Sequence, residues 1–170
     1  MQYLKIMEVY DMSGDLLEQE YQIIEKPALD VIGMQKKVNN KDVGPIGDLW
    51  QQVYKSEMLK LIPHKKHDHQ LFGMYSDYDM QLSGDYNLTI CTEVSQVPAV
   101  LPQGMVHIRV PAQRYAVFTA RGSFPICLME TWQRIWKTDL KRSYKNDFEE
   151  YNQDFGKLSS AKIDIYISIE

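Results

Sequence analysis

The residues with the clearest chemical potential stand near the C-terminal end of the chain, in the stretch Phe148-Glu149-Glu150-Tyr151. A carboxylate placed among tyrosine and tryptophan rings can hold a lipophilic cation. The carboxylate supplies charge, and the ring faces supply a cation–π attraction of about 0.5–2 kcal/mol. The same two acids could instead be solvated charges at the edge of a sheet. The spacing alone leaves both interpretations open.

Strand geometry constrains the two adjacent acids further. Successive side chains of a strand point to opposite faces, so only one of Glu149 and Glu150 can face a given cleft, and the spacing does not decide which. A buried glutamate without a partner would have a raised pKa and could shed its charge, unless neighbouring hydroxyl groups compensate for the lost water.

The elements that must position these residues show an internal repeat. Residues 23–28, followed by 31–34, are echoed by residues 108–112, followed by 115–118. Both copies contain two apolar stretches joined through a Pro-Ala step. Proline lacks a donor N–H and interrupts sheet pairing, so each copy predicts a bent strand or two short strands.

Each copy continues with a helix and two further strands. The apolar faces of the two predicted helices consist of Ile46, Leu49, Trp50 and Val53 in the first and of Leu128, Trp132, Ile135 and Trp136 in the second. The strands that follow are residues 72–75 and 86–94 in the first copy and residues 148–151 and 162–169 in the second. The pattern predicts an α+β fold made of βαββ twice.

The repeat also predicts the domain organisation. We expect one domain over residues 19–170, with repeat one at about 19–95, repeat two at about 105–170, and residues 1–18 as a leader or an extra strand. Two similar halves about a pseudo-twofold axis leave a ligand cleft where they meet. Aligning the halves sets Gly73 against Glu149 and matches Tyr75 with Tyr151.

The order and spacing of these pieces resemble a known family. The resemblance runs from about residue 20 to the end and is to the GyrI-like, or effector-binding, domain family. That family includes the ligand domains of Rob-type and BmrR-type transcription regulators and stand-alone members. The residues that carry the resemblance are Pro27-Ala28, Val31-Ile32-Gly33, residues 72–78, residues 108–112, Tyr115-Ala116-Val117-Phe118, Gly122, Trp132, Ile135-Trp136 and Phe148-Glu149-Glu150-Tyr151.

The resemblance implies a ligand site. In multidrug-responsive members, a buried glutamate in the C-terminal aromatic and acidic strand faces a cationic ligand, and this role carries over to Glu149. We expect an aromatic lining of Tyr75, Tyr115, Trp132, Trp136 and Tyr151. No cofactor and no metal are implied.

The resemblance and the charge together predict a binding module. Regulators of the family carry a DNA-binding module before this domain, and the resemblance here begins at about residue 20, so we expect a stand-alone domain that binds lipophilic, cationic or aromatic small molecules for sensing or sequestration. The net charge of −4 argues against direct nucleic-acid binding. A protein partner, either a regulator or DNA gyrase, stays open.

Two alternatives use other chemistry. Some stand-alone GyrI-like proteins hydrolyse reactive electrophiles, and Glu149 would then act as a general base towards water. The third hypothesis is a gyrase-inhibitor type of interaction, although residues 130–150 carry charges of both signs rather than a continuous acidic face. Binding is favoured over enzymatic activity.

The remaining polar clusters are expected to be structural. Cys91 and Cys127 are flanked by apolar residues and are predicted to be buried, reduced thiols. The segment Pro63-His64-Lys65-Lys66-His67-Asp68-His69 has the residue types of a metal site, but its lysines oppose cation binding, so we expect a solvated loop.

The sequence also predicts where the chain resides. Its apolar runs are far shorter than the ~20 residues that a membrane span needs, and Glu8 and Asp11 stand where a signal peptide would have its apolar core. We therefore expect a cytoplasmic protein without a membrane partner.

Overall fold

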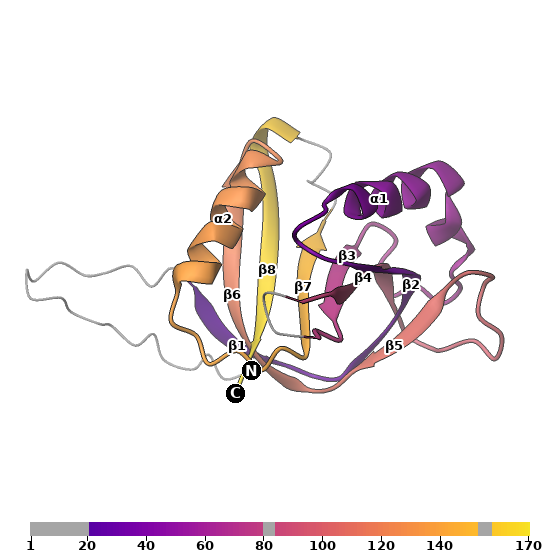
Figure 1. Ribbon diagram of the computed structural model, residues 1–170. Coiled ribbons are helices and arrows are strands. Elements are labelled where there is room, and N and C mark those ends of the chain that lie inside the picture. Colours follow the sequence, from indigo (N-terminus) through magenta and orange to yellow (C-terminus); the bar gives the residue numbers. More distant parts are fainter. Residues whose placement is uncertain (1–20, 80–83, 153–157) are drawn as a thin grey trace, which may run out of the picture.

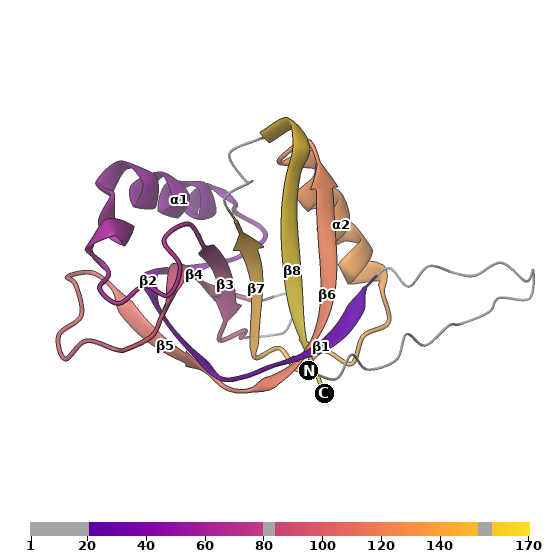
Figure 2. The ribbon, with the colours of Figure 1, turned by 180° about the vertical axis from the view of Figure 1, so that it is seen from behind.

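The computed structural model describes residues 21–79, 84–152 and 158–170, which form one strongly curved antiparallel sheet of eight strands with two α-helices on the same face (Figure 1). The strand order across the sheet is β1-β6-β8-β7-β3-β4-β2-β5, and Figure 2 shows the same sheet from behind. The predicted α+β class is confirmed. Residues 1–18, predicted as a leader or an extra strand, lie outside the described residues.

Both chain halves follow the predicted sequence of elements. The Pro-Ala steps separate β1 from β2 and β5 from β6, as the missing proline donor requires. The first half contains β1 (Gln22–Lys26), β2 (Leu29–Val38), α1 (Gly44–Ser56), the short 3-10 helix η1 (Met58–Leu61), β3 (Leu71–Ser76) and β4 (Tyr86–Val94). The second contains β5 (Val106–Val110), β6 (Gln113–Gly122), α2 (Ile126–Lys137), β7 (Asn146–Tyr151), the 3-10 helix η3 (Leu158–Ser160) and β8 (Ala161–Ile169).

The first strand of each half pairs with the other half. Strand β1 is hydrogen-bonded to β6, and β5 to β2, because the proline step lets the chain change direction between the two strands. The strand order therefore reads the same from either edge when each strand is exchanged with its counterpart in the other half. This interlocking was not predicted from the sequence. The predicted alignment of the two repeats matches Gly73 with Glu149, and in the structure these two residues are direct cross-strand partners.

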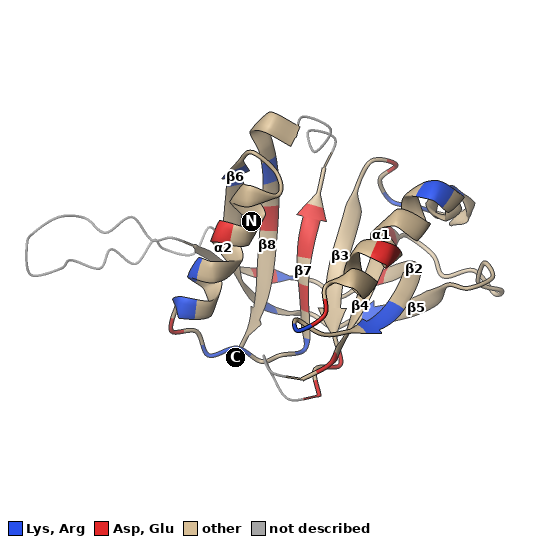
Figure 3. Ribbon diagram, turned by 45° about the horizontal axis from the view of Figure 1, so that its top comes forward, with Lys and Arg blue, Asp and Glu red and all other residues tan. Residues whose placement is uncertain are grey.

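The sheet buries a core on each face. On the helical face, α1 packs on β2 and β4, and α2 packs on β6 and β8, at either side of the central strands β7 and β3 (Figure 3). The opposite face buries a third cluster made entirely of strand residues, among them Val31, Phe72, Phe148 and Tyr166. Alternation along each strand produces this division, because neighbouring side chains point to opposite faces.

One glycine marks a close approach between strands. A Cβ atom at Gly33 of β2 would lie 2.0 Å from the carbonyl oxygen of Ile90 and 2.5 Å from the Cα atom of Cys91, both in β4. Only a residue without a side chain fits at this point of the sheet.

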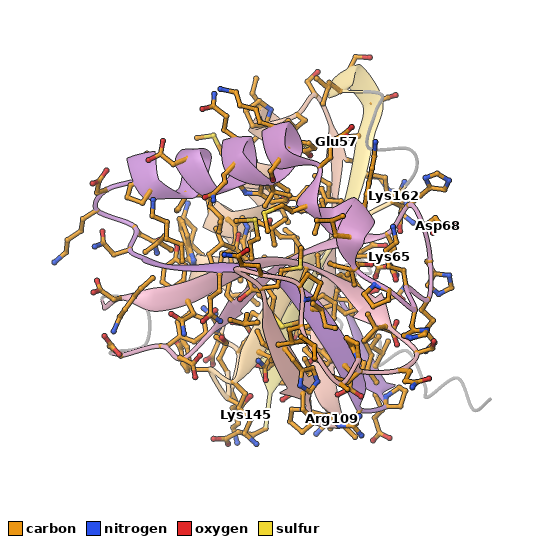
Figure 4. All side chains as sticks on the ribbon, turned by 90° about the vertical axis from the view of Figure 1, so that its right-hand side faces the viewer. Glu57, Lys65, Asp68, Arg109, Lys145 and Lys162 are labelled. Carbon is orange, nitrogen blue, oxygen red and sulfur yellow. The ribbon has the colours of Figure 1, made fainter. Side chains whose placement is uncertain are left out.

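The cysteines and the histidine-rich loop lie away from the centre of the helical face. Cys91 and Cys127 are buried and form no disulfide, as predicted, and burial raises the pKa of the Cys91 thiol. In the loop before β3, Lys65 and Asp68 form an ion pair of 3.9 Å at the outer side of the molecule (Figure 4). Among the residues that the structure describes, no group of three or more His, Cys, Asp or Glu side chains is placed to hold a metal ion. None of the described helices is long and apolar enough to cross a membrane.

Candidate ligand-binding site

Glu149 belongs to strand β7, which is largely coloured as acidic in Figure 3 and runs between the two helices. Its side chain is buried, with an exposed fraction of 2% for the residue. Its Oε1 atom accepts hydrogen bonds from Tyr75 Oη at 2.8 Å and from Trp132 Nε1 at 2.6 Å, and its Oε2 atom accepts one from Tyr151 Oη at 2.5 Å. All three donors are neutral groups, and none of the ion pairs among the described residues involves Glu149. The carboxylate is therefore solvated by fixed dipoles rather than neutralised by a cation.

Burial and hydrogen bonding act on the carboxyl group in opposite directions. Burial raises the pKa of Glu149 above its usual range, while the bonds from Tyr151, Trp132 and Tyr75 pull it down without cancelling that rise. Burial and the adjacent carboxylate raise the pKa of Tyr75 and Tyr151 well above the ordinary tyrosine value, so both hydroxyls stay protonated donors. A cation brought beside Glu149 would supply the compensation that the neutral donors only partly provide.

A cavity of about 310 Å³ opens beside this carboxylate, between the two helices. Its lining is mostly aromatic and aliphatic, and it comes from both chain halves. Val43, Met129 and Trp136 are exposed apolar residues of the lining, which gives this side of the molecule an apolar surface around the cavity. The cavity is lined by Asn40, Val43, Ile46, Tyr75, Tyr78, Tyr86, Leu128, Met129, Trp132, Gln133, Trp136, Arg142 and Glu149.

Strand register brings the polar groups of the site together. Glu149 and Tyr151 are two residues apart on β7 and therefore share a face, and Tyr75 stands on the neighbouring strand β3. Gly73 lies directly across from Glu149, where a Cβ atom would be 3.1 Å from Glu149 Oε2. The glycine leaves the space that the carboxylate occupies.

Four of the six residues predicted as ligand contacts line the cavity: Glu149, Tyr75, Trp132 and Trp136. Tyr151 is buried and contacts the site through its hydrogen bond to Glu149. Tyr115 is placed elsewhere. It lies in the cluster on the opposite face of the sheet, with its ring centroid 5.3 Å from that of Phe148.

The ambiguity between the two acids is resolved by alternation. Glu149 faces the cavity, whereas Glu150 points to the other face of β7 and accepts a hydrogen bond from Gln70 Nε2 at 2.6 Å. The carboxylate of Glu150 thus contacts a different set of side chains.

Several lining residues, chiefly Tyr78, Tyr86 and Arg142, were not predicted as ligand contacts. Tyr78 Oη donates to Asp147 Oδ2 at 2.7 Å, and Arg142 Nη2 donates to the same oxygen at 2.6 Å. Asp147 stands two residues before Glu149, so strand alternation could have placed it on this face. Arg142 belongs to the connection between α2 and β7, where no periodicity signals a position.

The sequence is similar to proteins of a known family. The model of the Cass2 family, described as an integron-associated effector binding protein, matches residues 22–169. The putative transcriptional regulator protein YobU of Bacillus subtilis (strain 168) is 33% identical over 125 residues, which are 72% of this chain and 78% of that protein. The transcriptional regulator BrlR of Pseudomonas aeruginosa is 34% identical over 157 residues, 86% of this chain and 54% of that protein. The chain thus spans about half the length of BrlR.

Solved structures show the same fold. An integron cassette protein from the mobile metagenome of Vibrio cholerae superposes with a TM-score of 0.70 at 26% identity, covering 89% of this chain and 97% of the other. SAV2435 bound to tetraphenylphosphonium gives a TM-score of 0.73 at 16% identity, covering 89% and 94%. The EcmrR C-terminal domain gives 0.61 at 17%, covering 89% and 99%.

Proposed function

The chain belongs to the family of integron-associated effector-binding proteins, and from this premise we propose that its cavity binds lipophilic organic cations. The observation that carries the proposal is the buried Glu149 carboxylate, held by three neutral donors beside a cavity lined with aromatic rings. The tetraphenylphosphonium ion bound by the structurally similar SAV2435 is a ligand of this class.

The physical argument rests on the balance of desolvation. A large organic cation is weakly hydrated, so it loses little on leaving water and gains apolar contact with Trp132, Trp136 and the tyrosines. It also contacts the Glu149 carboxylate, which already lost its hydrating water when the chain folded, so ligand binding does not have to remove that water. A small, strongly hydrated cation would lose far more on entering the same cavity.

Glu149 is better placed for binding than for general-base catalysis. Tyr75, Trp132 and Tyr151 already donate to its two oxygens, which leaves little acceptor capacity for the water molecule that a general base must hold. Both curated relatives carry regulatory names, so we propose that cation binding serves a regulatory response or sequestration of the cation.

The direct test is a titration with tetraphenylphosphonium and with tetraphenylborate, two ions of closely similar shape and opposite charge. We expect tetraphenylphosphonium to change the fluorescence of Trp132 and Trp136 and to raise the melting temperature with increasing concentration, because a ligand of the folded state stabilises it. Tetraphenylborate should do neither. Equal binding of the two ions would show that the cavity selects shape alone and would overturn the proposal.

Binding should also depend on pH. We expect the affinity for tetraphenylphosphonium, which does not titrate, to fall as the pH decreases through the pKa of Glu149. Since burial raises that pKa, the loss should begin at a higher pH than for an exposed glutamate. The folded chain binds this proton more tightly than the unfolded chain. In the absence of ligand, the free energy of unfolding should therefore decrease as the pH rises through the pKa of Glu149 in the folded chain.

The measurement is the dissociation constant of tetraphenylphosphonium from about pH 8 to about pH 4, with far-UV circular dichroism to follow folding. A constant affinity across the whole range in which the chain stays folded would contradict a charged Glu149 in the site.

A further inference from the structure

Arg142 is a second charged group at the wall of the cavity, and its partners leave part of it unused. Its side chain is 6% exposed and lines the cavity. Nη2 pairs with Asp147 Oδ2 at 2.6 Å, and the side chain of Asp147 is fully buried, with an exposed fraction of 0%. Its Nε and Nη1 atoms are also buried and have no hydrogen-bond partner among the described residues.

The neighbouring side chains offer no acceptor to the N–H groups of these two nitrogen atoms. The centroid of the Tyr144 ring lies 4.5 Å from Arg142 Cζ, a cation–π contact, and the ring offers these N–H groups no oxygen acceptor. Asp147 has no acceptor capacity left. Its Oδ1 atom accepts from the backbone N–H and from the Oγ–H of Ser168, both at 2.7 Å, and its Oδ2 atom accepts from Tyr78 and Arg142.

Arg142 lines the cavity and has two buried nitrogen atoms, Nε and Nη1, without an acceptor among the described residues, so we expect the ligand to supply one. Buried polar groups in folded proteins are nearly always hydrogen-bonded, and the N–H groups of a guanidinium make strong, charge-assisted hydrogen bonds to oxygen anions. Asn40, also in the lining, accepts from Tyr86 Oη at 2.7 Å through its Oδ1 atom, so its amide nitrogen adds a further donor.

We infer that the ligand of this cavity is zwitterionic or cationic with an oxygen acceptor. Glu149 holds its lipophilic cationic part, and Arg142 receives a carboxylate or a comparable oxygen group at the other polar point of the lining. The inference rests on the proposed function and adds to it that the cationic ligand also carries an oxygen acceptor.

The test uses triphenylphosphonium ions that bear carboxyethyl, carboxypropyl or carboxypentyl chains, each compared with the alkyl-triphenylphosphonium ion of the same chain length. We expect the wild-type chain to bind at least one carboxylate-bearing ion about tenfold more tightly than its alkyl reference, the size of one charge-assisted hydrogen bond. In Arg142→Lys, which keeps a positive charge for Asp147 but removes the Nε and Nη1 donors, this ratio should fall to near one. Arg121→Lys, the same change at an exposed position of β6, should retain the wild-type ratio.

A measurement on the wild-type chain protects the test against a variant that fails to fold. In arginine-labelled protein, the Nε–H resonance of Arg142 should shift downfield with the carboxylate-bearing ion and not with its alkyl reference. If every pair binds equally, or if Arg142→Lys keeps the preference, the inference fails, while binding of the alkyl ions still supports the proposed function. If no phosphonium ion binds, the proposed function and this inference fail together.

Discussion

Replacing Glu149 by glutamine is expected to weaken the binding of tetraphenylphosphonium by at least about thirtyfold, or roughly 2 kcal/mol. Glutamine keeps the size of the side chain, its amide oxygen can accept from Tyr75 and Trp132, and its amide nitrogen can donate to the Tyr151 hydroxyl oxygen, so the shape of the cavity should survive. What disappears is the negative charge beside the ligand. The measurement is the dissociation constant by fluorescence titration at a pH above the pKa of Glu149.

The matched control is Glu150→Gln, the same substitution one residue along the strand. Glu150 lies on the opposite face of β7, so its loss should leave the affinity for tetraphenylphosphonium within about twofold of the wild-type value. If the two variants lose affinity equally, the effect comes from the charge of the whole molecule or from damage to β7, and Glu149 is not the anion of the site.

The second large effect is on stability. Gly33→Ala is expected to lower the free energy of unfolding by roughly 3 kcal/mol or more, because its Cβ atom would lie 2.0 Å from the carbonyl oxygen of Ile90. That oxygen is backbone and cannot rotate away, so β2 and β4 would have to separate. Urea denaturation followed by circular dichroism measures the loss.

Gly47→Ala provides the comparison. Gly47 lies within α1 and has no neighbouring atom within 4 Å of the added methyl group, so the same change should stabilise the chain by about 0.5–1 kcal/mol. If Gly33→Ala were as stable as the wild type, the pairing of β2 with β4 would have to differ from the register that sets Gly33 opposite Cys91.

Much of the fold could be predicted because its signals are local. A proline followed by alanine marks the break in each bent strand, and apolar residues at helical spacing, such as Leu49 and Val53 in α1 and Ile135 in α2, mark the buried face of each helix. The exchange of β1 and β5 between the halves could not be predicted. It depends on which distant strand the chain meets after Pro27 or Pro111, and no local pattern encodes that choice.

The site was predictable to the extent that it follows strand alternation. Glu149, Tyr75 and Tyr151 belong to two neighbouring strands whose register places them on one face. Tyr115 matched the same family pattern, but its strand β6 turns that side chain to the opposite face. The placement of Arg142 depends on tertiary contacts with Asp147 and Tyr144, made from a connecting segment without periodicity.

The direct pairing of Gly73 with Glu149, at matching positions of the two halves, shows what an assembly of two identical halves could not do. Two identical halves must present the same residue twice at these positions, so the number of carboxylates there would be even. Two facing glutamates would compete for one proton, and two glycines would offer no anion. In a single chain the two halves can differ, so this protein has one carboxylate, that of Glu149, opposite Gly73. A ligand that enters the cavity therefore has no equivalent reversed orientation, and each chain should bind one molecule in one direction.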